Sequence, residues 1–290
     1  MNTYFLPLLF TAIALGILFP GGEALKPILP VLLGMLLFFN FYTIDIRWAH
    51  FLRKEILFYA LIVLGILPAL VVTTTKFLPA PFQLGIFLTT ISPSAVSGSI
   101  VVGIIGGSLE LSIANTVIFN LLSPFSYTLL TNVYFDTRDL QVSSGQTLLN
   151  LILLIGIPFV LSMFCKRAAS LNRPLHKLAG YTRMLFIFIV FMAISASSRQ
   201  LRHIPLQELA SVIGVIFLIV AIFYASGLLL GKDERTKRAL AVNMGQKNNS
   251  LCIWLALTNF GPLAAIPATV YIIMQHIFNS LLIFLFTRRK

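Results

Sequence analysis

Long apolar runs without a formal charge alternate with short polar segments along the whole chain. Eight of these runs cover residues 1–22, 27–44, 56–75, 78–109, 111–135, 140–165, 209–231 and 248–287. About 20 consecutive helical residues cross the ~30 Å hydrocarbon core of a bilayer, whereas the strands of a membrane barrel show short alternating segments. The pattern therefore predicts an all-α integral membrane protein.

Two of the runs are too long for a single helix and carry polar interruptions. Residues 78–109 contain Ser-Pro-Ser at 92–94, and residues 248–287 contain Gly-Pro at 261–262. Dividing them gives ten predicted transmembrane helices at about 3–20, 28–43, 56–75, 80–106, 109–131, 146–165, 183–197, 209–230, 238–259 and 264–286. The fourth and the ninth of these helices each contain a break.

Composition and charge agree with a membrane location. Of the 290 residues, 58% are apolar and 10% are charged, against about a quarter charged in a soluble domain. The net charge of +12 comes from basic residues in short loops. With 15 of them on the side of both termini and 5 on the other, they follow the positive-inside rule rather than indicating a nucleic-acid partner. We expect a multi-pass protein of the cell membrane, in bacteria the inner membrane, with both termini cytoplasmic.

The sequence carries no motif for a metal, a cofactor or a catalytic centre. Cys165 and Cys252 lie at or within apolar runs without metal-type spacing, and we interpret both as buried or lipid-facing residues. His-Glu-x-x-His, Gly-x-Ser-x-Gly and Asp-rich motifs are missing. We therefore expect neither a cofactor nor enzyme activity. The first apolar run lacks a preceding basic segment, which favours a retained helix over a signal peptide.

A short internal similarity indicates a duplicated chain. GSLELSIANTVIFN from Gly107 and GPLAAIPATVYIIM from Gly261 share Gly, Leu and Ala at the same offsets, 154 residues apart. Each half, 1–140 and 141–290, then contains five helices and one break. Because five is an odd number, the two halves would lie in opposite orientations. Paired breaks in inverted repeats often mark the binding site of a transporter.

The two breaks are predicted to lie at similar depth. Nine residues from the start of the ninth helix at Arg238 to Lys247 span about 13–14 Å, and twelve residues from Pro81 to Pro93 span about 18 Å. Both distances end near the middle of the bilayer, approached from opposite sides. Irregular backbone at this depth must be buried in protein or line an aqueous cavity.

The residues at the breaks favour an anionic ligand. Each break starts a half-helix whose free N–H groups and dipole attract negative charge. Lys247 adds a formal positive charge at the same place. The small and polar residues available there are Ser97, Gly98 and Ser99 in the first break and Gln246, Asn248, Asn249 and Ser250 in the second.

Lys247 and Glu110 each allow a simpler interpretation. A lysine can snorkel from a helix end, but one held near mid-membrane costs at least ~2.5 kcal/mol on insertion scales, which favours a functional placement. A Schiff-base role has no supporting neighbour in the sequence. Glu110 fits an interfacial position at the start of the fifth helix, with a proton-titrating or lysine-pairing role as the alternative.

Four stretches resemble the bile acid:sodium symporter (BASS) family. The stretch SPSAVSGSIVVGIIGGSLELSIANTVIFNLLSP from Ser92 is similar to the family's crossover segment, and NMGQKNNSL from Asn243 to its Glu-Val-Gly-Met-Gln-Asn-Ser-Gly-Leu signature. GMLLFFNFYTID from Gly34 and QHIFNSLL from Gln275 resemble two further helices. The resemblance spans nearly the whole chain, although each motif is degraded, and it identifies a distant member.

The resemblance implies a fold and a site. It implies a panel domain of helices 1, 2, 6 and 7, a core domain of helices 3–5 and 8–10, and crossed breaks in helices 4 and 9. It places Gln275 and His276 at substrate-lining positions, although a lone helical histidine is often only structural. The implied substrate-binding set is Ser97, Gly98, Ser99, Lys247, Asn248, Asn249, Gln275 and His276.

The family's two sodium sites are only partly kept. The shared glutamate matches Asn243, and the two glutamines of the second site match Val63 and Lys247. The side chains of the first site match Gly98, Ser99, Ser112 and Thr116. Ser112 and Thr116 are also four apart, a spacing at which hydroxyls often bond to their own helix. Hard cations prefer several oxygen ligands including an anionic one, so we expect Lys247 to replace sodium at the second site. At the first site, Ser99, Ser112, Thr116 and Asn243 would hold sodium weakly or not at all.

The expected function is secondary transport of an organic anion by alternating access. The substrate would be a bile acid, a steroid sulfate or a small carboxylate, and the partners would be this substrate and the lipid bilayer, with a monomeric chain. Proton exchange at Lys247 is one candidate for what drives the cycle. A passive facilitator or channel, and a non-transporting sensor on the same fold, are the alternatives.

Overall fold

The computed structural model describes residues 5–44, 54–135 and 143–287. Within these ranges the chain is helical, and its one sheet-like feature is an isolated antiparallel bridge between Ser94 and Lys247. The predicted all-α class is therefore confirmed.

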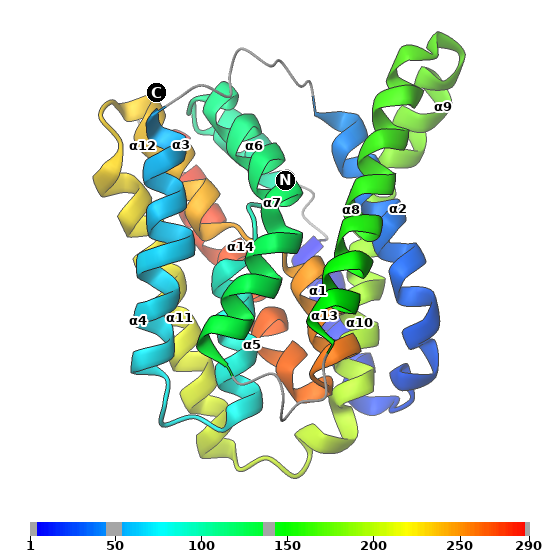
Figure 1. Cartoon of the computed structure of the whole chain (residues 1–290), viewed down its shortest axis with the longest axis vertical. Helices are drawn as coiled ribbons and strands as arrows, with labels where there is room; N and C mark the ends of the chain where they lie inside the picture. The colour runs from blue at the N-terminus through cyan, green and yellow to red at the C-terminus, as the bar shows by residue number, and fades with distance from the viewer. Residues whose placement is uncertain (1–4, 45–53, 136–142, 288–290) are drawn as a thin grey trace.

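The helices follow one another with short connections (Figure 1). In chain order they are α1 (Phe5–Leu18), the 3₁₀ helix η1 (Gly22–Ile28), α2 (Leu29–Thr43), α3 (Lys54–Ala60), the π-helix η3 (Leu61–Ile66), α4 (Leu67–Thr74), α5 (Ala80–Ile91), α6 (Ser97–Ile104), α7 (Leu109–Tyr134), α8 (Ser144–Arg167), α9 (Ala169–Ala179), α10 (Thr182–Leu201), α11 (Leu206–Leu230), α12 (Glu234–Gly245), α13 (Asn249–Asn259), the 3₁₀ helix η4 (Pro262–Ala265) and α14 (Ile266–Thr287).

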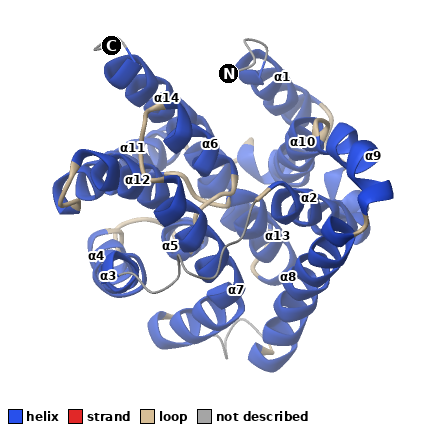
Figure 2. Ribbon diagram, turned by 90° about the horizontal axis from the view of Figure 1, so that it is seen from above, coloured by secondary structure: helices blue, strands red, loops and turns tan. Residues whose placement is uncertain are grey.

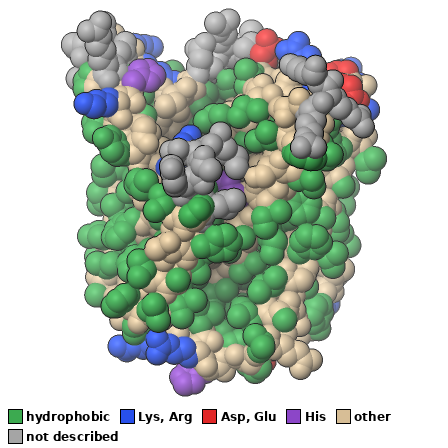
Figure 3. Space-filling model, turned by 180° about the vertical axis from the view of Figure 1, so that it is seen from behind, with side chains coloured by type: hydrophobic (Ala, Val, Ile, Leu, Met, Phe, Trp, Pro, Cys, Tyr) green, Lys and Arg blue, Asp and Glu red, His purple; other side chains and the backbone are tan. Residues whose placement is uncertain are grey.

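The helices have the length and surface of membrane spans. In the described ranges, seven helical stretches are long and apolar enough to cross a bilayer, and two shorter apolar helices lie at Pro7–Leu18 and Ala80–Ile91. Apolar side chains cover the middle of the molecule on the face shown in Figure 3, and charged side chains gather at its two ends. These features support a multi-pass membrane protein.

Two groups of helices lie side by side when the molecule is seen from above (Figure 2). One group contains α1, α2, α8, α9 and α10, and the other contains α3, α4, α11, α12 and α14. The half-helices α5, α6 and α13 lie between them or at their boundary, so both breaks are close to where the groups meet.

The two interrupted helices cross at their breaks. Residues 92–96 separate α5 from α6, and residues 246–248 separate α12 from α13. The Ala95 amide donates to the Gln246 carbonyl at 2.9 Å, and the Asn248 amide donates to the Pro93 carbonyl at 2.8 Å. Each break thus satisfies backbone groups of the other, which is a requirement at membrane depth.

The predicted helix positions were right to within a few residues in most places, with two clear differences. The ninth helix begins at Glu234 rather than Arg238, because Asp233 caps it by accepting from the amides of Arg235 and Thr236. The helix α9 was not predicted. Residues 3 and 4, the start of the first predicted helix, lie outside the described ranges.

Candidate functional site

A cavity of about 210 Å³ lies against the crossing of the two breaks. Its wall is formed by residues of α1, α2, α6, α10, α13 and α14 together with both breaks. Phe5, Arg183 and Ile283 lie near the helix ends that face the chain termini, so the cavity opens toward that end of the molecule. No aspartate or glutamate of the described chain lines it, and Arg183 is an exposed cation in its wall.

Carboxamides form the inner wall of the cavity. The Gln275 Oε1 atom accepts from the backbone amide of Lys247 and from the Asn249 Nδ2 atom, both at 3.0 Å. The Asn279 Nδ2 atom donates to the Gln246 Oε1 atom at 2.9 Å, and Gln246 donates to the Ser97 hydroxyl at 2.7 Å. Helix α14 therefore holds the second break in place through two amide side chains.

One hydrogen-bond acceptor in this wall lacks a donor among the described residues. The Asn249 Oδ1 atom is buried and has no hydrogen-bond partner among the described residues. Since buried polar atoms are nearly always paired, this oxygen indicates a missing donor, such as a hydroxyl of a ligand or a water. It lies in the first turn of α13, where free N–H groups also point.

Helix α7 supports the crossing from its other side. The Asn120 Nδ2 atom donates to the Ser94 carbonyl at 2.9 Å, and its Oδ1 atom accepts from the Asn248 Nδ2 atom at 2.9 Å. A single fully buried side chain thus contacts both breaks. Sequence reasoning missed Asn120, because a polar residue in an apolar helix does not indicate which neighbours it meets.

Lys247 is buried at the crossing. Its side chain is only 1% exposed, so it does not reach the interface as a snorkelling lysine would. The Nζ atom lies 5.0 Å from the centre of the Phe223 ring of α11. Within the described chain no hydrogen-bond acceptor reaches it. Lys247 is also one of the residues that line the cavity. Its ammonium lies against an aromatic face, an arrangement worth about 2 kcal/mol when it is shielded from water.

The backbone carbonyl of Asn243 is already engaged by hydroxyl groups. The Tyr59 hydroxyl donates to this carbonyl at 3.0 Å, and the Ser94 hydroxyl contacts it at 2.7 Å. Tyr59 and Ser94 also contact each other at 2.8 Å. Tyr59 lies one turn before Val63, the position that matches a sodium-binding glutamine, and we did not predict its role.

Three of the four residues expected to form a weak first sodium site are joined directly. The Ser112 hydroxyl donates to the Asn243 Oδ1 atom at 2.8 Å and lies 3.0 Å from the Ser99 hydroxyl. The Thr116 hydroxyl is fully buried without a partner among the described residues. The oxygens expected to bind an ion are therefore largely bonded to one another.

Six of the eight expected substrate-binding residues lie in the cavity wall: Ser97, Lys247, Asn248, Asn249, Gln275 and His276. Gly98 and Ser99 do not. A Cβ atom at Gly98 would lie 3.4 Å from Val242 of α12, and Ser99 faces α7 through Ser112. Both residues are on the side of α6 that faces away from the cavity. Glu110 is exposed in the first turn of α7, as the interfacial interpretation predicts.

Several lining residues were not predicted. Arg183 was grouped with the loop charges, and nothing in the sequence distinguished Phe5. Asn40 lies in the GMLLFFNFYTID stretch that carries the resemblance, but no role was predicted for it. The His276 ring lies 4.7 Å from the Phe5 ring, so contact with the first helix covers it. Asn279 lies in the QHIFNSLL stretch that carries the resemblance, and that signal could have identified it.

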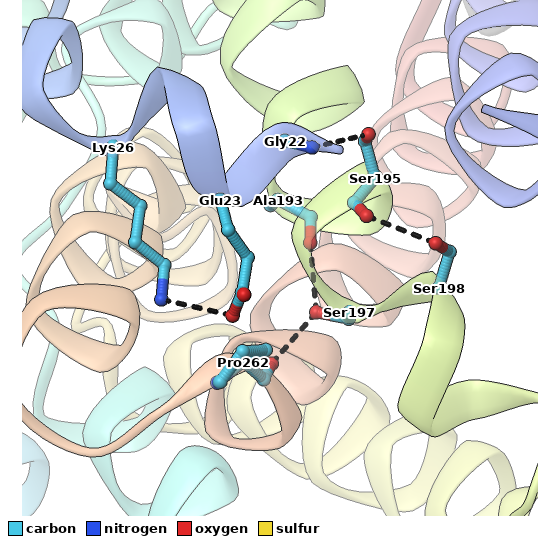
Figure 4. Close-up of polar contacts among 8 residues, drawn as sticks. All are labelled: Gly22, Glu23, Lys26, Ala193, Ser195, Ser197, Ser198 and Pro262. Atoms are coloured by element: carbon cyan, nitrogen blue, oxygen red, sulfur yellow. Dashed lines mark hydrogen bonds and ion pairs between the residues drawn. The ribbon is translucent and has the colours of Figure 1, made fainter. Parts of the chain in front are cut away.

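Serine side chains near the end of α10 contact the segments around η1 and η4 (Figure 4). The Ser195 hydroxyl donates to the Phe19 carbonyl at 2.6 Å and accepts from the Gly22 amide at 2.8 Å. The Ser197 hydroxyl donates to the Pro262 carbonyl of η4 at 2.9 Å. These contacts hold η1 and η4 on α10.

Comparison with known proteins places this arrangement in a family. The family model of the SBF-like CPA transporters matches residues 3–288. The chain belongs to the SBF-like CPA transporter family. The expected relationship to the bile acid:sodium symporters is thereby confirmed.

Two relatives show how distant the similarity is. An uncharacterized sodium-dependent transporter of Bacillus subtilis, YocS, is 26% identical over 211 residues, which cover 71% of this chain and 64% of that protein. A probable chloroplastic sodium/metabolite cotransporter of rice (Oryza sativa subsp. japonica), BASS1, is 26% identical over 253 residues, 82% of this chain and 60% of its own length. The chain thus spans less than two thirds of the length of either relative.

Proposed function

We propose that this SBF-like protein is a secondary transporter that carries a small organic anion by alternating access, with the Lys247 ammonium in place of the ion at the second sodium site. The observation that carries the proposal is the buried ammonium of Lys247 at the crossing of two broken helices. The relatives named as a sodium-dependent transporter and a sodium/metabolite cotransporter support transport as the activity.

The proposed topology has ten spans in two inverted repeats. The broken pairs α5–α6 and α12–α13 supply the matching interruptions, and their bridged residues Ser94 and Lys247 are 153 residues apart, close to the 154-residue offset of the sequence similarity. In this topology α1, α2, α8 and α10, which are the predicted helices 1, 2, 6 and 7, would form the panel domain. The predicted helices 3–5 and 8–10 would form the core domain. Both termini would be cytoplasmic, in the bacterial inner membrane, and the chain monomeric.

The cavity favours a small anion. Its lining has the first turns of α6 and α13, the Arg183 guanidinium and no carboxylate from the described residues. Its volume of about 210 Å³ lies below the ~300 Å³ at which sites for drug-sized ligands begin. A small carboxylate with a hydroxyl group fits this volume better than a bile acid or a steroid sulfate. The hydroxyl would donate to Asn249 Oδ1.

Lys247 and the hydroxyl groups of Tyr59 and Ser94 disfavour the binding of sodium at the second site. An ammonium at the position of a ligand repels a second cation, and at ~4 Å in a protein interior two unit charges interact by about 4 kcal/mol even at an effective dielectric constant of 20. The backbone carbonyl of Asn243, the residue that matches the shared glutamate, accepts from Tyr59 and Ser94. We therefore expect transport that does not require sodium at this site.

Uptake into proteoliposomes tests the proposal. A thermal-shift screen of small carboxylates and of amphipathic anions first identifies a ligand. Uptake of that ligand is then measured with and without a sodium gradient, and counterflow separates a carrier from a channel. Saturable, sodium-independent uptake with counterflow is expected. A sodium requirement with a stoichiometry near two would show that Lys247 does not replace the ion, and binding without uptake would favour a sensor.

A further inference from the structure

Two buried carboxamides, those of Asn249 and Gln275, lie together in the wall of the cavity at the crossing. Asn249 belongs to the first turn of α13 and is 1% exposed, and Gln275 belongs to α14 and is 3% exposed. Both residues line the cavity. Their side chains bond to each other and to the backbone of Lys247.

The backbone of Lys247 fixes the orientation of both carboxamides. The Lys247 amide can only donate and lies 3.0 Å from one end of the Gln275 carboxamide, so that end must be the oxygen. The same oxygen lies 3.0 Å from the Asn249 carboxamide, which must therefore present its nitrogen. The Lys247 carbonyl can only accept, and at 3.3 Å from this nitrogen it requires the same orientation. Exchanging O and N in either side chain would place two acceptors or two donors against each other.

Each carboxamide keeps one polar atom that the described chain does not satisfy. For Asn249 this atom is Oδ1, an acceptor that is buried without a partner among the described residues. For Gln275 it is Nε2, a donor, because the hydrogen bonds that its carboxamide forms with the described residues both use Oε1. Since the two carboxamides are joined by a hydrogen bond, this acceptor and this donor belong to one small region of the wall.

A hydroxyl group satisfies both atoms at once. Its hydrogen donates to Asn249 Oδ1, and its oxygen accepts from Gln275 Nε2. The oxygen of an oxo group accepts but cannot donate, so it would leave Asn249 Oδ1 unpaired. A methylene group would leave both atoms unpaired. Because an unpaired buried polar group is costly, this part of the wall favours a hydroxyl over either alternative.

The acid group of such a ligand has a donor available on α6. The Gln246 Nε2 atom donates to the Ser97 hydroxyl oxygen at 2.7 Å, so the hydrogen of Ser97 is not used in that bond. Ser97 lies at the start of α6 and lines the cavity. Its hydroxyl can therefore donate to a carboxylate while the Asn249–Gln275 pair binds the hydroxyl of the same ligand.

We propose that Asn249 and Gln275 are the specificity-determining pair of the site and select hydroxy acids over oxo acids and unsubstituted acids. Lys247 acts on this pair as a positioning residue through its backbone, in addition to the charge of its ammonium. That the ligand is an acid rests on the proposed function. That it carries a hydroxyl rests on the fixed orientation of the two carboxamides.

Equilibrium binding of matched four-carbon acids to the full-length protein in detergent tests the proposal. The probes are 2-hydroxybutyrate and 3-hydroxybutyrate, each as separate enantiomers, together with 2-oxobutyrate and butyrate. At least one hydroxybutyrate should bind about 10-fold or more tightly than both 2-oxobutyrate and butyrate. If 2-oxobutyrate or butyrate binds as tightly as every hydroxybutyrate, as it would if a water molecule filled the pair, the proposal is overturned.

Substitutions assign the preference to the pair. Asn249→Leu removes the acceptor and should abolish the preference for the hydroxybutyrates. Gln275→Leu removes the donor, should have the same effect, and serves as the second variant if the first does not fold. Asn40→Leu is the matched control, because Asn40 lines the same cavity from α2, and it should keep the wild-type preference. A preference that survives in Asn249→Leu, or one that is lost in Asn40→Leu, would contradict the assignment.

Uptake into proteoliposomes separates this inference from the proposed function. A protein that prefers hydroxybutyrates in binding but does not take them up would contradict only the transport function. A protein that takes up 2-oxobutyrate as well as the hydroxybutyrates would contradict only the selection of a hydroxyl. Binding of none of the probes would contradict both.

Discussion

Replacing Lys247 by methionine should make the protein more stable and inactive. Burying an ammonium costs several kcal/mol, and its replacement by an apolar side chain of similar size is often neutral or stabilising by 1–4 kcal/mol. Here the ammonium has no hydrogen-bond acceptor among the described residues, and the Phe223 ring, 5.0 Å away, returns about 2 kcal/mol. Methionine keeps most of the packing without the charge.

The expected gain in stability is the cost of burying the charge minus the contribution of the Phe223 ring. We expect the free energy of unfolding to increase by about 2 kcal/mol, which corresponds to a rise in unfolding temperature of about 4–8 °C for a protein of this size. Anion uptake should be lost, because the fixed charge at the crossing is gone. Thermal unfolding in detergent and uptake into proteoliposomes measure the two effects.

The control is a partly exposed lysine in the helix that leads to the second break. Lys237 of α12 is 36% exposed and pairs with Glu234 at 3.0 Å, so Lys237→Met should change stability by no more than about 1 kcal/mol and leave uptake intact. Combining Lys247→Met with Phe223→Leu gives a double-mutant cycle with an expected coupling of about 0.5–2 kcal/mol. A loss of stability in Lys247→Met, or unchanged uptake, would refute the reasoning.

Three further substitutions test other parts of the structure. Asn120→Ala should lower the free energy of unfolding by about 2–4 kcal/mol, because it leaves polar groups of both breaks unpaired; an unchanged thermal unfolding curve would contradict this. Gly22→Ala should lower it by about 1–3 kcal/mol, because the new Cβ atom would lie 2.5 Å from the Met192 carbonyl; Gly214→Ala, with no atom within 4 Å, is the control. Arg183→Gln should weaken anion affinity by about 10-fold while leaving stability within about 0.5 kcal/mol; retention by Arg183→Lys would show that charge alone is needed.

The sequence predicted the membrane fold and the place of the site, because both depend on signals that are local in the chain. Hydropathy located the spans, and the polar residues around Pro93 and Lys247 located the breaks. Helix α9 was missed because its segment is polar and contains Pro174, both of which favour a loop. The early start of α12 was missed because its first turn is charged, and only the cap at Asp233 marks it.

The partners of the site residues could not be predicted. That Lys247 meets Phe223, or that Tyr59 donates to Asn243, depends on which helices are neighbours, and a periodic pattern does not contain that information. The direction in which Gly98 and Ser99 face could not be predicted either. Their position in α6 was right, but the turn of the helix directs Ser97 into the cavity and its two successors away from it.

The bridge between the two breaks also has a consequence for how the protein is made. Among the described residues, the Pro93 carbonyl and the Ala95 amide bond to Asn248 and Gln246, and Asn120 contacts Asn248 across 128 residues. At 5–20 residues per second, the ribosome needs roughly 10–30 s to reach the second break after the first. During that interval the backbone groups of the first break still lack these hydrogen-bond partners in the bilayer. A chain truncated before Gln246 should therefore be retained by the insertion machinery or degraded, whatever the quality of its apolar helices.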